Sequence, residues 1–272
     1  MSLNIKDLKE KYKDIAPNEK VLNNILSEVV FGFSEIKNFI ENKNIKSVLE
    51  IGAGPGILLH ELKQAYPHIK MVGLEPLRSG YLRFKKIKKI DGENLTIINQ
   101  GIEEFKTQEK FDLIFSVNAL EHIPNWETYF ETTQKILNAN SSNVILCPNY
   151  DFPYESHYII PIIFNKKITK FFFNKYIKKH DIENDIVGHW ESINFISKKK
   201  LKKFMIKKNY NFYFDDSIKN RILNRILYDK ALKKRQGIMG YIAIISKYLF
   251  LDKIFFDILK VPFPFLKLII KN

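Results

Sequence analysis

The most constraining feature of this sequence is a short apolar run that ends in three alternating glycines, Gly52, Gly54 and Gly56. The run, residues 46–51, has the composition of a buried strand, and apolar residues at helical spacing follow over 57–66. A glycine loop between a strand and a helix lets a ligand lie against bare backbone, because glycine lacks a Cβ atom and tolerates positive φ. The helix amino terminus favours a negatively charged ligand group. The sequence therefore predicts a ligand site at the end of this strand.

The residues in and after the glycine loop argue against two common phosphate-binding loops. The dinucleotide fingerprint G-x-G-x-x-G needs glycine where the chain has Ile57, which disfavours a nicotinamide-dependent oxidoreductase. A P-loop needs a Lys-Ser or Lys-Thr pair after the glycines, and the chain has none there. A second apolar run, 71–74, ends at Glu75. An acidic residue at the tip of a second strand can accept hydrogen bonds from both hydroxyls of a ribose, so we expect Glu75 to bind a nucleoside.

A second motif, F-D-L-I-F-S-x-N-x-L-E-H-I-P, covers residues 111–124. Together with the glycine loop and Glu50 before it, this segment resembles the class I S-adenosylmethionine (SAM)-dependent methyltransferases, in the branch that includes the quinone-biosynthesis methyltransferases. The resemblance covers roughly residues 46–150. It implies a Rossmann-like α/β fold with a mostly parallel, doubly wound sheet, with SAM as cofactor and S-adenosylhomocysteine (SAH) as product.

The resemblance also implies which residues hold the cofactor. The methionine part would lie near Glu50 and the loop, the ribose at the second strand tip, and the adenine near residues 102–103, with two residues of the second motif closing the cleft. The implied contacts are Glu50, Gly52, Ala53, Gly54, Gly56, Glu75, Pro76, Ile102, Glu103, Asn118 and Leu120.

The second motif also argues against one substrate class. Enzymes that methylate nucleic-acid amines resemble each other in an Asp/Asn-Pro-Pro-aromatic loop after the fourth strand, where this chain has Ser-Val-Asn-Ala at 116–119. Nucleic acid is therefore disfavoured as the methyl acceptor.

Alternating strand and helix patterns predict five successive regions. Strands are expected at 46–51, 71–74, 95–98, 111–117, 144–147 and 210–214, and helices at 5–13, 18–42, 57–66, 77–89, 126–138 and 198–208; the partner of the last strand is not located. The regions are an N-terminal helical cover (1–45), the SAM-binding core (46–148), an aromatic, irregular insertion that serves as substrate lid (149–195), a completion of the core (196–216) and a basic, apolar helical extension (217–272).

Polar side chains of the lid and of the second motif are the candidates for substrate chemistry. His122 follows the fourth strand near the expected methyl position, and histidine titrates near neutral pH, so His122 and His157 are the candidate bases. The alternative for His122 is that it only orients its loop. Substrate contacts are expected from Tyr150, Tyr154, Glu155 and His189, each of which could instead be structural. No His, Cys or Asp cluster has metal-ligand spacing in the sequence, so no metal is expected.

The charge of the chain is concentrated in its second part. Residues 1–150 hold 19 basic and 19 acidic side chains, whereas residues 151–272 hold 25 and 11 and carry the whole net charge of +14. This asymmetry predicts an anionic partner: a phosphorylated substrate, a membrane surface or a nucleic acid. The extension could lie on an anionic membrane or pack over the substrate pocket.

The remaining features concern location and function. The single cysteine, Cys147, cannot form an internal disulfide, and the amino terminus lacks the apolar core of a signal peptide, so a cytoplasmic location with peripheral membrane contact is expected. We expect methyl transfer to an oxygen, with carbon or nitrogen less favoured, of a small metabolite that carries phosphate or a lipid. The alternative is a non-catalytic SAM-fold module whose basic part binds anionic lipid or nucleic acid.

Overall fold

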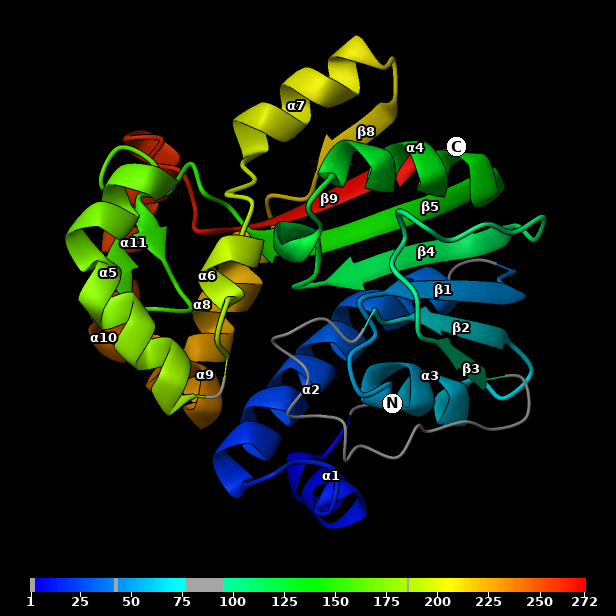
Figure 1. Cartoon of the computed structure of the whole chain (residues 1–272), viewed down its shortest axis with the longest axis horizontal. Helices are drawn as coiled ribbons and strands as arrows, with labels where there is room; N and C mark the ends of the chain where they lie inside the picture. Colours follow the sequence, from blue (N-terminus) through cyan, green and yellow to red (C-terminus); the bar gives the residue numbers. More distant parts are fainter. Residues whose placement is uncertain (1–2, 42–43, 77–94, 185) are drawn as a thin grey trace.

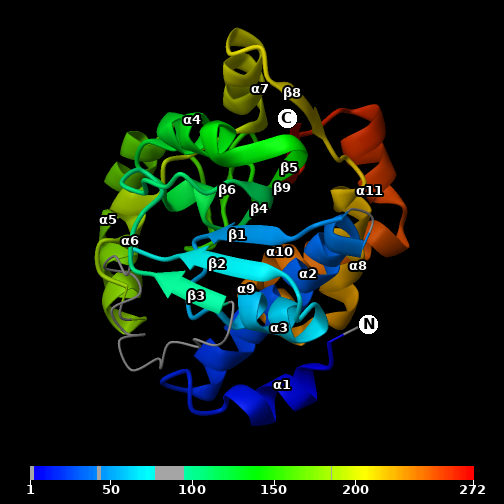
Figure 2. The same ribbon diagram turned by 90° about the vertical axis from the view of Figure 1, so that its right-hand side faces the viewer.

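A computed structural model describes residues 3–41, 44–76, 95–184 and 186–272. Within these residues the core is a seven-stranded sheet in the order β3-β2-β1-β4-β5-β9-β8 (Figure 1, Figure 2). β1 to β5 are parallel to one another, and β9 is antiparallel to both of its neighbours, β5 and β8. The strands are β1 (Ser47–Ile51), β2 (Lys70–Leu74), β3 (Leu95–Ile98), β4 (Phe111–Val117), β5 (Leu137–Pro148), β8 (Asn211–Phe214) and β9 (Phe265–Lys271).

The sheet is buried on both faces, which is why its strands read as continuous apolar runs. Val48 and Phe115 pack into one core, and their neighbours Leu49 and Ile114 pack into the other. Because successive side chains of a strand point to opposite faces, each core lies on one side of the sheet. This arrangement confirms the Rossmann-like α/β class. The first core is covered by α1 (Ile5–Tyr12), α2 (Glu19–Glu41) and α3 (Ile57–Ala65), and the second by α4 (Trp126–Ile136) and α7 (Lys198–Lys207).

The sequence-based boundaries around β5 are wrong by several residues. The sequence predicts a helix over 126–138 and a strand over 144–147 with a loop between them, but α4 ends at Ile136 and β5 begins at Leu137. Residues 138–143, at the start of β5, are mostly polar and have the composition of a loop. They are extended because they pair with the far end of the chain: the Asn140 amide donates to the Asn272 carbonyl at 3.0 Å.

The seventh strand of the sheet is β9, in a segment that the sequence analysis assigned to the helical extension. Leu266, Leu268 and Ile270 enter one core and Ile269 enters the other, so the segment lacks the polar alternation that marks a half-buried strand. A short apolar run of this kind cannot be told from a buried helix by periodicity. The helical interpretation of the extension is therefore wrong for Phe265–Lys271.

The insertion after β5 is more regular than expected. It contains the hairpin β6 (Tyr154–Glu155) and β7 (Ile160–Pro161), the 18-residue helix α5 (Lys166–Glu183) and the short helix α6 (His189–Ser192). Only Thr169, Ile177 and Asp181 of α5 are buried, so the helix carries no clear apolar stripe in its sequence. The absence of that stripe explains why α5 was not predicted.

The extension is helical from residue 218 to 258 and lies with α5 beyond the carboxyl ends of the parallel strands (Figure 1). Its helices are α8 (Ile218–Tyr228), α9 (Lys230–Arg235), α10 (Gly237–Tyr248), α11 (Leu251–Lys253) and η3 (Ile254–Ile258). In open α/β sheets ligands bind at this end of the strands, so the lid and the extension are placed to enclose one. The helix expected at 77–89 lies outside the described residues.

Candidate active site

The glycine loop has the backbone conformation that its sequence predicts. Gly52, Gly54 and Gly56 all have positive φ, at 78°, 52° and 78°. A Cβ atom on Gly52 would lie 2.4 Å from the Cβ of Ala119, so no larger residue fits there without a shift. The loop is held by the Gly52 amide, which donates to the Leu74 carbonyl at 2.8 Å. The bare backbone of the loop is therefore available to a ligand at the ends of β1 and β2.

Two buried carboxylates, Glu50 and Glu75, flank this loop. Glu75 accepts a hydrogen bond from the Gly54 amide at 2.8 Å. Glu50 Oε2 is buried and has no hydrogen-bond partner among the described residues. Burial, reinforced by the charge of Glu75, raises the pKa of Glu50 to about 8. A buried, unsatisfied carboxyl is costly, and a cationic ligand group beside it would remove the cost.

A single cleft of about 2940 Å³ joins the glycine loop to the lid and the extension. Its predicted lining residues are Glu50, Gly52, Ala53, Gly54, Asn118, His122, Tyr154, His157 and His189. Other predicted cofactor residues do not line the cleft: the side chains of Ile102 and Leu120 are buried in the core, Glu75 contacts the glycine loop, and Pro76 and Glu103 are not among the lining residues. The glycine loop and most of the residues predicted to act on the substrate therefore line the same cleft.

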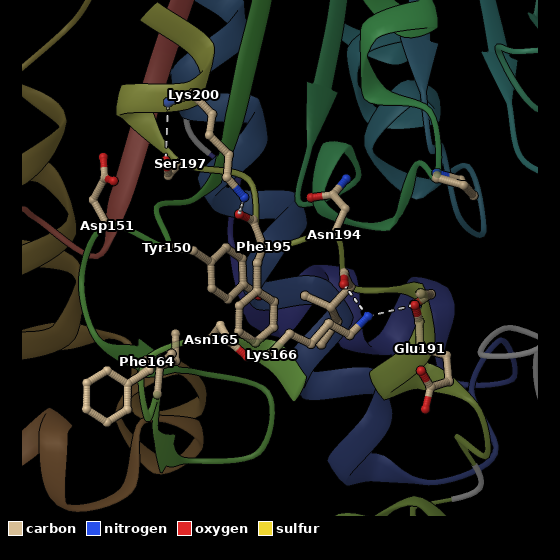
Figure 3. A pocket seen from close by; sticks show the side chains of 14 residues that line it. Tyr150, Asp151, Phe164, Asn165, Lys166, Glu191, Asn194, Phe195, Ser197 and Lys200 are labelled. Carbon is tan, nitrogen blue, oxygen red and sulfur yellow. Dashed lines mark hydrogen bonds between the residues drawn. The ribbon is translucent and has the colours of Figure 1, made fainter. Parts of the chain in front are cut away.

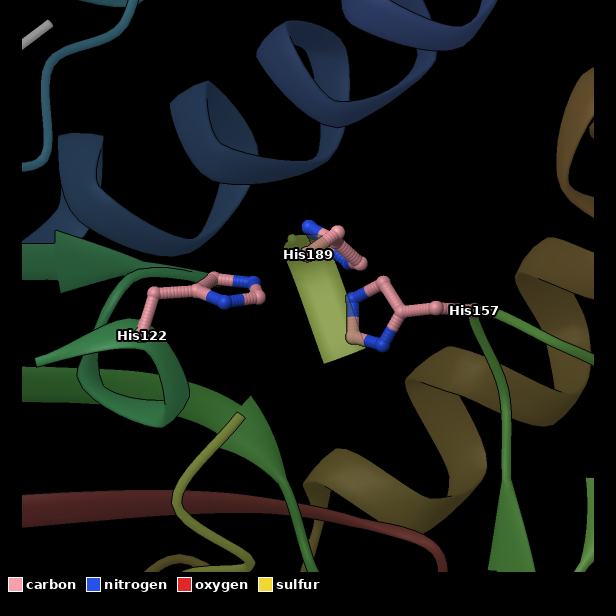
Figure 4. Close-up of side chains that lie close together, drawn as sticks. All are labelled: His122, His157 and His189. Atoms are coloured by element: carbon pink, nitrogen blue, oxygen red, sulfur yellow. The ribbon is translucent and has the colours of Figure 1, made fainter. Parts of the chain in front are cut away.

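Three histidines from separate segments meet in this cleft (Figure 4). The ring centroids are 5.4 Å apart for His122 and His157, 4.8 Å for His122 and His189, and 5.0 Å for His157 and His189. Burial, followed by the charge of His157, lowers the pKa of His122 to about 3. Burial acts to lower the pKa of His157 as well, but the carboxylate of Glu155 outweighs it and raises that pKa.

Glu155 links three other residues of the lid through hydrogen bonds. Its wholly buried carboxylate accepts hydrogen bonds from His157 Nδ1 at 2.6 Å, the Tyr158 amide at 2.8 Å and the Tyr150 hydroxyl at 3.0 Å. Tyr150 itself stacks on Phe195, with ring centroids 4.6 Å apart, and lines a separate pocket of about 630 Å³ (Figure 3). Of the four predicted substrate residues, Tyr154 and His189 line the cleft, whereas Tyr150 and Glu155 do not.

A partly buried charge cluster that no sequence pattern indicates lines the cleft on the side of the extension. Glu28 of α2 accepts hydrogen bonds from Asn118 Nδ2 at 2.8 Å and Arg225 Nη2 at 3.0 Å, and from Arg235. Burial acts to raise the pKa of Glu28, but the two guanidinium groups outweigh it and lower the pKa to about 2. No local signal reveals these partners, because they are distant in the sequence.

Comparison with known proteins identifies the family. Residues 28–213 match the model of a family described as "Methyltransferase domain", which is more than half of the chain. The chain belongs to the class I SAM-dependent methyltransferases. An uncharacterised protein of Mycobacterium tuberculosis is 31% identical over 196 residues, which cover 70% of this chain and 66% of that relative. A malonyl-[acyl-carrier protein] O-methyltransferase of Ilyobacter polytropus is 31% identical over 36% of this chain and 38% of its own length.

Solved structures agree with this assignment at the level of the fold. One of them is phosphoethanolamine N-methyltransferase 2 of Haemonchus contortus, crystallised with SAM. It superposes on this protein with a TM-score of 0.56 and 12% sequence identity, and the match covers 98% of this chain and 56% of that enzyme. SAM is the cofactor of this family, and the site fits it, because Gly52 leaves no room for a side chain and Glu50 offers a buried, unpaired carboxyl oxygen. That this chain belongs to the branch of the quinone-biosynthesis methyltransferases stays a prediction.

Proposed function

We propose that this protein transfers a methyl group from SAM to an oxygen of a small metabolite that enters the cleft between the glycine loop and the lid. The observation that carries the proposal is that the glycine loop and the histidine cluster line the same cleft. What the cofactor supplies is a methyl carbon already activated by its sulfonium. The residues of the chain then hold the acceptor in line, exclude water and receive the acceptor proton.

The histidine cluster suits an acceptor that must lose a proton, such as a hydroxyl. Glu155 fixes the orientation of the His157 ring through its Nδ1 atom, so Nε2 is the nitrogen left to face an acceptor. A positioned proton acceptor contributes about 10²- to 10⁴-fold to a rate. Carbon or nitrogen acceptors remain the less favoured alternatives. The family match favours this enzymatic role over a non-catalytic binding module.

Two lysines of α9 support an anionic group on the acceptor. Lys230 and Lys234 are exposed, line the cleft and form no salt bridge with any described residue. Arg225 and Arg235, which also line the cleft, are already engaged in salt bridges, Arg225 with Glu28 and Asp229 and Arg235 with Glu28. We therefore extend the proposal to an acceptor whose phosphate binds Lys230 and Lys234.

The experiment is methyl transfer from radiolabelled SAM to a bacterial metabolite and lipid extract, with and without phosphatase treatment of the extract. Labelling should depend on the protein and fall after phosphatase treatment. Lys234→Gln should lower labelling, whereas Lys233→Gln should not, because Lys233 packs over the Tyr241 ring and does not line the cleft. Labelling that survives phosphatase treatment would refute the proposal of a phosphorylated acceptor. Absence of labelling together with absence of SAH binding would refute the proposed methyltransferase activity.

The surface of the extension supports a lipid-linked acceptor reached at a membrane. Large apolar side chains are exposed from Ile238 to Leu259, among them Tyr248 at 72% and Phe250 at 65%, and Lys247 and Lys253 lie among them. Exposed apolar area next to basic groups favours adsorption to anionic lipid. Among the described helices, none is long and apolar enough to cross a bilayer.

Sedimentation with vesicles tests this contact. The protein should sediment with vesicles that contain phosphatidylglycerol more than with phosphatidylcholine alone. Tyr248→Ser should weaken this binding, and Ile206→Ser on α7, an exposed apolar residue outside the extension, serves as the matched control. Equal binding by the Tyr248 variant and the wild type would refute a membrane role for the extension.

A further inference from the structure

The three histidines of the cleft have a geometry that no sequence spacing could indicate. His122 ends the short 3-10 helix η2 (Leu120–His122), His157 follows β6, and His189 begins α6. One ring nitrogen from each can be chosen so that all three lie within 4.8 Å of one another. The rings are inclined by 45° to 69°, so they converge rather than stack (Figure 4).

The hydrogen bonds around His122 fix which of its nitrogens is available. The Ser192 hydroxyl has one proton, and it donates that proton to the His189 carbonyl at 2.7 Å. Its contact with His122 Nδ1 at 3.0 Å must therefore be one in which the ring N–H donates. His122 Nδ1 thus carries the hydrogen, and the lone pair of the neutral ring is on Nε2, which is directed toward the other two rings (Figure 4).

His157 is oriented by the same kind of contact. Its Nδ1 lies 2.6 Å from Glu155 Oε1, and that carboxylate also accepts hydrogen bonds from Tyr150 and Tyr158. The ring N–H therefore donates to the carboxylate and leaves Nε2 toward the cluster. A histidine that binds a metal almost always donates its other N–H to a carboxylate, carbonyl or similar acceptor. Both His122 and His157 have such an outer contact.

Carboxyl groups that could balance a cation are also present. Glu155 contacts His157 directly, and Glu121 precedes His122 in the chain. Glu121 is wholly buried, and neither of its carboxylate oxygens has a hydrogen-bond partner among the described residues. A buried carboxylate without partners needs a compensating positive group nearby.

We infer that His122, His157 and His189 form a binding site for one divalent transition-metal ion of the zinc type, open to the cleft at its fourth position. Three imidazoles select zinc, cobalt, nickel or iron over magnesium or calcium, which prefer oxygen ligands. Metal–nitrogen bonds of about 2.0–2.1 Å in a tetrahedron require nitrogens about 3.3 Å apart, so small side-chain rotations suffice. The inference rests on the proposed function in one respect: the open position would bind the acceptor hydroxyl and favour its ionised form, and the hydroxyl proton would pass to solvent, because the Nε2 atom of His157 would then hold the ion.

The test uses the full chain without a polyhistidine tag, after removal of metals with a chelator. Titration with Co²⁺ should show visible absorption bands of a tetrahedral site that saturate at one ion per chain, and Zn²⁺ should displace it. His157→Gln and His189→Gln should each weaken Co²⁺ affinity by more than 100-fold. The matched control is His180→Gln, which removes a lid histidine outside the cluster and should leave affinity unchanged.

A milder variant covers the case in which a histidine substitution impairs folding. Ser192→Ala keeps all three histidines but removes the acceptor for His122 Nδ1, and loss of an outer contact of this kind weakens metal binding by about 10- to 100-fold. Absence of stoichiometric Co²⁺ binding, or unchanged affinity in both His157→Gln and Ser192→Ala, would overturn the metal site. SAH binding is measured in parallel on the wild type, and its absence would overturn the methyltransferase proposal instead.

Discussion

Replacing Glu50 with glutamine should make the protein more stable and less able to bind its cofactor. Glu50 is buried, its Oε2 is unpaired among the described residues, and its pKa is about 8 rather than 4.5. Between about pH 4.5 and 8 the folded state therefore keeps a proton on Glu50 that the unfolded state has already lost. The free energy of unfolding consequently falls as pH rises through this range. At 1.36 kcal/mol for each pKa unit, the loss is about 5 kcal/mol above pH 8.

Glu50→Gln removes the titration but keeps the side-chain shape. Its free energy of unfolding should exceed that of the wild type by about 3–5 kcal/mol at pH 8.5 and by less than about 1 kcal/mol at pH 5. Affinity for SAH should fall about 10- to 100-fold, because a hydrogen bond to a charged group contributes about 1.5–3 kcal/mol. Urea unfolding followed by tryptophan fluorescence gives the first quantity, and calorimetric titration with SAH gives the second.

A second buried glutamate provides the control. Glu35 is as buried as Glu50, but its oxygens contact Arg221 Nε at 2.6 Å and Lys267 Nζ at 2.8 Å. Glu35→Gln should therefore destabilise the protein at pH 8.5, opposite in sign to Glu50→Gln. If Glu50→Gln proves equal to or less stable than the wild type at pH 8.5, the pKa of Glu50 is not raised in the folded state and the reasoning fails.

Two further substitutions test the loop and the charge cluster. Gly52→Ala places a Cβ atom 2.4 Å from the Cβ of Ala119 at a φ of 78°. It should lower the free energy of unfolding by about 1–3 kcal/mol and abolish SAH binding in the calorimetric titration. Intact SAH binding would show that the loop adapts to the added atom. Arg225→Met removes a partner of the half-buried Glu28 and should lower the free energy of unfolding by about 3–5 kcal/mol in urea at pH 7; a loss below 1 kcal/mol would mean that Arg235 suffices.

The glycine loop and the first four strands could be predicted because their information is local. Each strand is a short apolar run that ends at a polar or glycine residue, and the positive φ of Gly52 follows from the residue type that the loop requires. β9 could not be predicted in the same way, because its apolar run follows an equally apolar helical segment and no recognisable motif borders it. α5 was missed for a different reason, since it buries too little to show any period.

The site shows the same division between local and distant information. Glu50 and Gly54, which their motif singles out, and His122, which follows β4, all line the cleft, while their roles stay predictions. The meeting of His122 with His157 and His189 depends on the path of the lid, and the contact of Glu28 with Arg225 depends on the packing of α2 against the extension. Long-range pairs of this kind leave no mark on a single sequence.

The position of the extension between β8 and β9 has a consequence for how such a protein can change. These strands are hydrogen-bonded neighbours, with Phe214 paired to Leu268, so all of the intervening helices form one long hairpin connection. The entropy of closing a loop grows slowly with its length, by about 0.6 kcal/mol for each doubling. The segment can therefore be shortened, lengthened or exchanged while the sheet keeps its pairing. In this sense the extension is a replaceable module, inserted between two adjacent strands of a core that keeps the glycine loop intact.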